Sequence, residues 1–186
     1  TSGIGYATLV TSRDGVHWER HDDIFFDRNP DPDAWDRAMT WIGSVLPVGD
    51  DFFIYYGGYK RGHKVEPKTE RQIGLAKMPM DRLVSRDATG EKPGRILTVP
   101  LRLPENRAHR LVLNASAAEG QIRLQLRDAE KGDVLPGYAL ADCAPIQGDG
   151  PALPVLWKDQ QQLPRGTVRI ELEITRAGVF GFHLAP

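Results

Sequence analysis

The stretch from Thr167 to Thr175 alternates apolar and polar residues along its whole length, and this period of two constrains the fold more than any other feature. Such alternation makes one face of a β-strand apolar and leaves the other face in water. The pattern recurs in Leu111–Asn114 and Gln121–Arg127. Strands of this kind belong in antiparallel sheets that turn one face toward a core. We therefore expect an antiparallel β-sandwich in this half, with Val179–Leu184 as its final strand.

The N-terminal half also carries strand signals and no long amphipathic helix pattern. Its candidate strands are short, rich in aromatic and β-branched residues, and bounded by Gly, Asp and Pro: Ile4–Thr11, Trp41–Leu46, Phe52–Tyr56 and Ile73–Ala76. The cluster Gly49–Asp51 lies between two of these runs and predicts a tight hairpin turn. The expected fold class is therefore all-β over the entire chain.

A short internal sequence repeat favours a repeated sheet in this half. Ile4-Gly-Tyr-Ala7 recurs as Ile73-Gly-Leu-Ala76, although two short matches can also arise by coincidence. Between the copies the order of elements is strand, turn, strand, strand, strand, which suits the four-stranded blade of a β-propeller. In the segment Ser12–Trp18, Asp14 and Gly15 predict a turn in which the carboxylate caps backbone N–H groups. Trp18 is expected to pack back onto the blade.

Charge and cysteine content argue against several classes of partner. Basic and acidic residues are interspersed and the net charge is −1, so neither a nucleic-acid surface nor a membrane-binding polybasic segment is predicted. The single cysteine, Cys143, has no partner for an internal disulfide, and no Cys/His spacing resembles a zinc site. We predict no metal and no cofactor. Because the sequence starts at Thr1 without methionine, we expect a processed form or a piece of a longer protein.

Several segments resemble a known family. Three segments of the first half are similar to the last blades of five-bladed propellers related to family-32 and family-43 glycoside hydrolases: Ser12–Arg20, Phe53–Gly58 and Ile73–Ala76. Further segments are similar to the β-sandwich appended to such propellers in glycosidase-like proteins: Gly94–Leu101, Leu113–Asn114, Gly120–Arg123, Pro136–Cys143 and Val155–Trp157. The resemblance implies a terminal, incomplete propeller part at residues 1–90 and a jelly-roll-like sandwich at 91–186. The turn-rich stretch Asp87–Gly94 is the expected linker.

The resemblance also implies a carbohydrate partner, a glycosidase-like activity for the parent protein, and a secreted or periplasmic location. Most catalytic carboxylates of such enzymes are expected on blades that precede Thr1, so we expect this piece alone to be inactive. Two alternatives stay open. The chain is either a non-catalytic carbohydrate-binding or scaffold module, or a propeller-like interaction protein in which the sandwich only packs. The sequence does not predict the oligomeric state.

Candidate site residues lie around the expected entrance to the last blade. Asp36 is the candidate catalytic residue, because glycoside hydrolysis uses paired carboxylates beside the scissile bond; the alternative is a contact with Arg37 or with backbone. Aromatic faces stack on sugar rings, although a tryptophan is more often part of a core. A loop histidine can contact a glycan hydroxyl, or it can simply be solvated. The candidate substrate-binding residues are Trp35, Arg37, Trp41, Tyr56 and His63.

Overall fold

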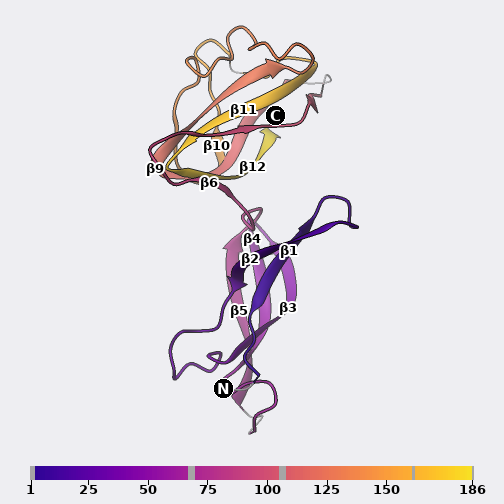
Figure 1. Cartoon of the computed structure of the whole chain (residues 1–186), viewed down its shortest axis with the longest axis vertical. Coiled ribbons are helices and arrows are strands. Elements are labelled where there is room, and N and C mark those ends of the chain that lie inside the picture. Colours follow the sequence, from indigo (N-terminus) through magenta and orange to yellow (C-terminus); the bar gives the residue numbers. More distant parts are fainter. Residues whose placement is uncertain (1–2, 67–69, 105–107, 161, 186) are drawn as a thin grey trace. The chain divides into compact units, whose positions relative to one another are not determined.

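The computed structural model describes residues 3–66, 70–104, 108–160 and 162–185. These residues form twelve β-strands and no α-helix (Figure 1). The all-β class expected from the sequence is therefore confirmed. The chain divides into two compact units, Thr1–Met80 and Asp81–Pro186.

The first unit contains a two-stranded hairpin and a three-stranded antiparallel sheet. The hairpin consists of β1 (Ala7–Ser12) and β2 (Trp18–Phe26). The sheet has the order β3-β4-β5, formed by β3 (Met39–Val48), β4 (Asp51–Tyr59) and β5 (Arg71–Pro79). The four strands expected in this half overlap β1, β3, β4 and β5. Strand β2 was not expected, because its residues 19–23 are mostly charged.

Two predicted turns are present in this unit. Gly49 and Asp50 connect β3 to β4 directly, since Val48 pairs with Asp51. Gly49 has a φ of 61°, a conformation that glycine adopts without steric cost. At the tip of the β1–β2 hairpin, the Asp14 carboxylate accepts hydrogen bonds from the backbone N–H groups of Val16 at 2.8 Å and His17 at 2.7 Å.

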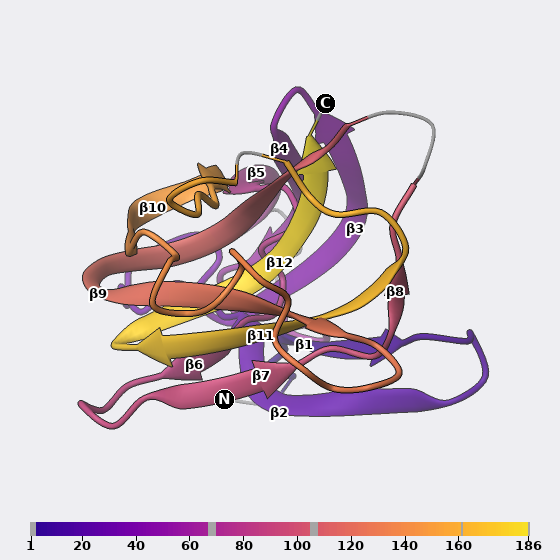
Figure 2. The same cartoon turned by 90° about the horizontal axis from the view of Figure 1, so that it is seen from above.

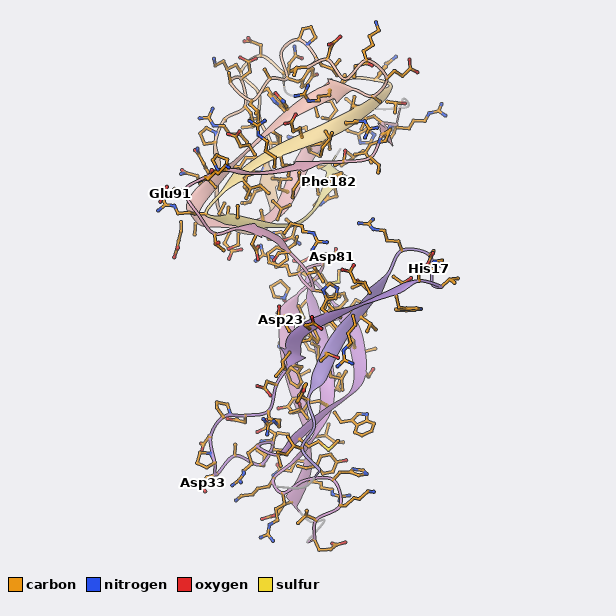
Figure 3. The ribbon with its side chains drawn as sticks, in the orientation of Figure 1. His17, Asp23, Asp33, Asp81, Glu91 and Phe182 are labelled. Atoms are coloured by element: carbon orange, nitrogen blue, oxygen red, sulfur yellow. The ribbon has the colours of Figure 1, made fainter. Side chains whose placement is uncertain are left out.

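The expected packing of Trp18 onto the blade is wrong. Trp18 follows the turn at the hairpin tip, where Figure 3 labels His17, and its side chain is 62% exposed. Hydrogen bonds from backbone N–H groups to the Asp14 carboxylate and to the Ser12 hydroxyl hold the turn, so the turn does not require the tryptophan to pack.

The β3-β4-β5 sheet has two different faces, because side chains alternate along each strand. The Tyr55 face carries Trp41, Tyr55, Tyr59, Ile73 and Leu75, as the strand register requires. On this face Ile73 is 83% and Trp41 57% exposed. The opposite Tyr56 face carries Ile54, which is 3% exposed. Tyr55 and Tyr56 therefore point to opposite faces.

The second unit forms one seven-stranded sheet. The path β6-β12-β9-β11-β7 is extended by β10, which pairs with β9, and by β8, which pairs with β11. These strands are β6 (Arg86–Ala88), β7 (Gly94–Leu97), β8 (Leu101–Arg102), β9 (Arg110–Asp128), β10 (Ile146–Pro154), β11 (Thr167–Thr175) and β12 (Ala177–Ala185).

The long strand β9 makes the sheet curve around a single core (Figure 2). Its first half pairs with β10 and β12, and residues 121–128 pair with β11. The expected strands Leu111–Asn114 and Gln121–Arg127 are thus two parts of one strand. Gly120 lies at the bend, where a side-chain carbon would overlap the carbonyl oxygen of Thr175. Close backbone approach therefore requires glycine at this position.

The core of the second unit follows the predicted alternation. Ile170, Leu172 and Ile174 of β11 are at most 2% exposed, and they face Ile122, Leu124 and Leu126 of β9. Each such aliphatic side chain contributes roughly 1.5–3 kcal/mol when fully buried. Three further residues of this core are buried: Tyr138, Cys143 and Trp157.

The two units divide after Met80 rather than after residue 90. Strand β6 pairs with β12, so Asp87 and Ala88 of the expected linker are part of the second sheet. Arg82 also belongs to this unit. Its Nε donates to the side-chain oxygen of Asn114 at 2.8 Å, and its guanidinium lies 4.9 Å from the centre of the Phe180 ring.

Candidate functional site

Asp36 lies in the loop between β2 and β3, directly before the β3-β4-β5 sheet begins; Figure 3 labels Asp33 on the same loop. Its side chain is buried, with the residue 7% exposed. The Tyr56 hydroxyl donates to Asp36 Oδ2 at 2.9 Å. Burial, together with the hydrogen bond to Asp36 and its negative charge, raises the pKa of Tyr56 to about 12. Asp36 Oδ1 is buried and has no hydrogen-bond partner within the described part of the chain.

Aromatic rings surround this hydrogen bond. Trp35 stacks on the Tyr56 ring with centroids 5.7 Å apart, and Phe26 meets the same ring edge-on at 4.9 Å. We call Phe26, Trp35, Asp36 and Tyr56 the Tyr56 cluster. Two glycines make room for it: a side-chain carbon at Gly58 would overlap the Trp35 ring, and one at Gly74 would lie 2.5 Å from the Tyr56 ring.

Arg37 does not contact the neighbouring carboxylate. Its Nη1 donates to the Pro32 carbonyl at 2.6 Å, and the residue is exposed. The alternative interpretation of Asp36 as a simple partner of Arg37 is therefore wrong, because the partner of Asp36 is a tyrosine of β4. Arg37 instead stabilises the turn that carries Trp35.

Trp41 and His63 lie on the Tyr55 face of the sheet, away from the Tyr56 cluster. Their ring centroids are 6.2 Å apart, and the Tyr59 ring meets His63 edge-on at the same separation. Arg71 lies over Tyr59 at 4.8 Å and donates to the His63 carbonyl at 2.7 Å. We call Trp41, Tyr59, His63 and Arg71 the Trp41 surface. Gly57 pairs with Trp41 in the register, and nothing lies within 4 Å of the position its side-chain carbon would take.

Five of the six predicted site residues thus form two groups, Arg37 belongs to neither, and the six do not converge on one point. The Tyr56 cluster is half-closed and aromatic, whereas the Trp41 surface is open to solvent. Sequence reasoning missed Phe26, Tyr59 and Arg71. Tyr59 and Arg71 are cross-strand partners on the face that carries Trp41, and this pairing depends on the register of β4 and β5, so no local sequence signal marks them.

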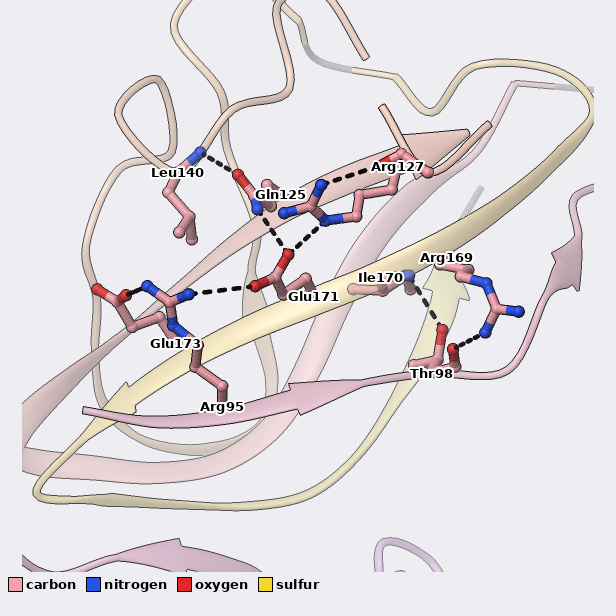
Figure 4. A network of polar contacts seen from close by, with 10 residues as sticks. Arg95, Thr98, Gln125, Arg127, Leu140, Arg169, Ile170, Glu171 and Glu173 are labelled. Atoms are coloured by element: carbon pink, nitrogen blue, oxygen red, sulfur yellow. Dashed lines mark hydrogen bonds and ion pairs between the residues drawn. The ribbon is translucent and has the colours of Figure 1, made fainter. Parts of the chain in front are cut away.

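The second unit holds a charged network on the outer side of the β9–β11 pair (Figure 4). Glu171 accepts hydrogen bonds from Gln125 Nε2 at 2.6 Å and from Arg127 Nε. Burial opposes the charged form of Glu171, but these hydrogen bonds and the charges of Arg127 and Arg95 outweigh it and lower its pKa. Since the partners are part of the sheet itself, the network stabilises the β9–β11 pairing.

Neither a metal-binding group of side chains nor a membrane-spanning helix is present among the described residues. Within residues 3–66, 70–104, 108–160 and 162–185, no group of three His, Cys, Asp or Glu side chains is placed to hold a metal ion. No helix in that part of the chain is long and apolar enough to cross a membrane. Cys143 is a buried free thiol, and burial raises its pKa.

Comparisons with protein-family models, curated proteins and solved structures find no match to this chain. A fold class hosts many activities, so the function has to follow from the chemistry of the two residue groups.

Proposed function

We propose that this chain recognises carbohydrate through the Trp41 surface. The observation that carries the proposal is the exposed indole of Trp41, 57% accessible on a sheet face beside the open space at Gly57. A flat apolar ring that is left in water is well suited to stack on the C–H face of a sugar ring. An oligosaccharide placed there covers apolar surface without a deep pocket.

Polar groups beside the indole support this choice. The His63 ring lies 6.2 Å from Trp41, and the Arg71 guanidinium lies over Tyr59 in the next cross-strand row. Imidazole nitrogens and guanidinium N–H groups form hydrogen bonds with hydroxyls. Aromatic stacking combined with a few oriented polar groups is the usual arrangement in small-ligand sites.

For the finer architecture we propose a terminal propeller blade in the first unit and a jelly-roll-like module in the second. The exposed apolar side chains of the Tyr55 face support the blade. Ile73 is 83%, Leu46 47% and Leu75 44% exposed, and a face of this kind is suited to pack on another sheet. The resemblance to glycoside hydrolase propellers suggests a secreted or periplasmic parent protein with glycosidase-like activity.

We propose a supporting role for Asp36 in such an enzyme. Glycoside hydrolysis uses two carboxylates on either side of the bond, and Asp36 supplies one. Its Oδ1 is buried without a partner among the described residues, so a sugar hydroxyl or a catalytic acid would reach it only if the groups around it moved. The hydrogen bond from Tyr56 fixes the orientation of the carboxylate.

A binding experiment with a matched pair of tryptophan variants tests the proposal. Neutral oligosaccharides of different composition are titrated against the isotope-labelled chain, and the indole N–H signals are followed by NMR. Trp41→Ala should abolish the binding. Trp18→Ala is the control, because Trp18 is equally exposed at 62% but lies at the hairpin tip. No binding by any oligosaccharide, or equal loss in both variants, would contradict the proposal.

The second candidate function is a scaffold without glycan binding, and the exposed Tyr55 face favours it. In that case Trp41 packs against a protein surface together with Ile73 and Leu75. No sugar would then shift the Trp41 indole signal, and the chain would bind another sheet through this face.

A further inference from the structure

A groove of about 490 Å³ opens in the second unit beside Arg123 of β9. Its lining includes the apolar residues Ala141, Pro145 and Leu156 and the charged residues Arg123, Asp142 and Lys158. Leu156 is 46% exposed there. The volume lies within the range of small-molecule sites, roughly 300–1,000 Å³.

The groove is held in shape by backbone hydrogen bonds. Ala144 N–H donates to the Leu156 carbonyl at 2.9 Å, and Lys158 N–H donates to the Asp142 carbonyl at 3.0 Å. Beneath these segments, Trp157 is 4% exposed and its indole N–H donates to the Leu124 carbonyl at 3.1 Å. The two walls are thus tied to each other and to β9, so a ligand would find the site already formed.

Among the arginines of the β9–β11 region, Arg123 has the weakest hydrogen bonds and ion pairs. Arg127 pairs with Glu171, and Arg95 pairs with Glu173 at 3.2 Å. Arg123, in contrast, has no carboxylate within 4.0 Å in the described part of the chain, and its hydrogen bond to the Leu140 carbonyl is 3.5 Å long. A bond of this length is weak, so most donors of the guanidinium are available.

The other two charges in the lining of the groove balance each other. The ammonium of Lys158 lies 3.7 Å from the Asp142 carboxylate. The lining therefore keeps one net positive charge, that of Arg123. The ligand that this arrangement fits has one negative charge, hydroxyl groups for Asp142 and Lys158, and an apolar face for Leu156.

We propose that this groove binds a hydroxylated monocarboxylate of the uronate-sugar type. Its carboxylate forms the paired hydrogen bonds with Arg123 that a guanidinium makes with planar anions. Its hydroxyls lie against Asp142 and Lys158, and its C–H face lies on Leu156. The choice of a sugar acid rests on the proposed carbohydrate function, whereas the choice of a carboxylate rests on Arg123 alone.

The test is an NMR titration of the full chain with D-glucuronate, with D-glucose and benzoate as comparison ligands. Glucuronate should shift the backbone signals of residues 141–145 and 156–158 and the side-chain signal of Arg123. Glucose lacks the carboxylate and benzoate lacks the hydroxyls, so both should bind at least several-fold more weakly. If glucuronate shifts none of these signals, or glucose binds equally well, the proposal is overturned. Stronger binding of benzoate than of glucuronate would overturn the assignment of the ligand as a sugar acid.

Two variants and a control separate this site from the Trp41 surface. Arg123→Gln should weaken glucuronate binding about tenfold or more, the expected loss for a charge-assisted hydrogen bond. Leu156→Ala, at an exposed position that folding tolerates, should weaken it less. Arg86→Gln, an exposed arginine of β6 outside the groove, should leave it unchanged. Trp41→Ala should also leave it unchanged, so failure of the proposed function at the Trp41 surface and failure of this inference give different results.

Discussion

The hydroxyl of Tyr56 on β4 donates a 2.9 Å hydrogen bond to the buried carboxylate of Asp36, twenty residues earlier in the chain. This bond ties the loop before β3 to the middle of the sheet. It is also the one hydrogen bond to this carboxylate within the described residues, because the second oxygen is buried without a partner. The orientation of Asp36 therefore depends on a single phenol.

Replacing that phenol should cost stability. Tyr56→Phe leaves a buried carboxylate without a donor, and the expected loss is about 1–3 kcal/mol in the free energy of unfolding. Urea unfolding followed by tryptophan fluorescence measures it, since Trp35 stacks on this ring. Tyr55→Phe is the matched control: its side chain is 39% exposed on the other face, so the change should stay within about 0.5 kcal/mol. Equal losses in the two variants would show that the bond to Asp36 contributes nothing.

The bend of β9 should depend on Gly120. Gly120→Ala places a methyl group against the carbonyl of Thr175, and either the bend or the β11–β12 turn has to move. Overpacking of this kind costs about 1–3 kcal/mol, and we expect the upper end because the obstacle is backbone. Gly181→Ala is the control, since nothing lies within 4 Å of its added carbon. Thermal unfolding of both variants decides the point, and a Gly120→Ala chain as stable as the control would contradict the expected overlap.

The sequence predicts those parts of the fold that depend on local pattern. Burial on one face repeats every two residues in β11, so Ile170, Leu172 and Ile174 could be assigned to the core in advance. The Gly49–Asp50 turn was equally readable, because turn residues separate two apolar runs. The sequence does not predict that β9 is one continuous strand. This continuity depends on the contact between Gly120 and Thr175, which only the folded chain creates.

The sequence predicts part of the composition of the candidate site but not its arrangement. Trp35 and Trp41 are close in sequence, yet Trp35 lies in a loop where strand parity does not apply, so nothing local assigns the two rings to opposite faces. The partner of Asp36 is likewise set by the register of β3 and β4. Arg71 joins the Trp41 surface only through pairing of β4 with β5.

The stability of the second unit should fall in acid because of Glu171. Its pKa is lowered from 4.5 in the folded chain, so its contribution to stability is fully present above 4.5 and is lost as the pH falls through the folded-state pKa. Glu171→Gln should therefore flatten the acid side of a plot of unfolding free energy against pH. Glu119→Gln, at an exposed position of β9, should keep the wild-type slope. If the two variants lose stability in acid alike, the network of Figure 4 does not set this dependence.

The Tyr55 face should make the chain associate with itself in solution. Ile73 and Leu75 project from β5, a strand paired on one side only within the described residues, and they are 83% and 44% exposed. An apolar face beside an unpaired edge favours contact with another sheet. Sedimentation velocity over a range of concentrations should therefore show reversible association. Ile73→Lys should shift the chain toward monomer, whereas Val16→Lys should not, because Val16 is 74% exposed but lies at the hairpin tip. A wild-type chain that stays monomeric at every concentration would mean that this face does not drive self-association.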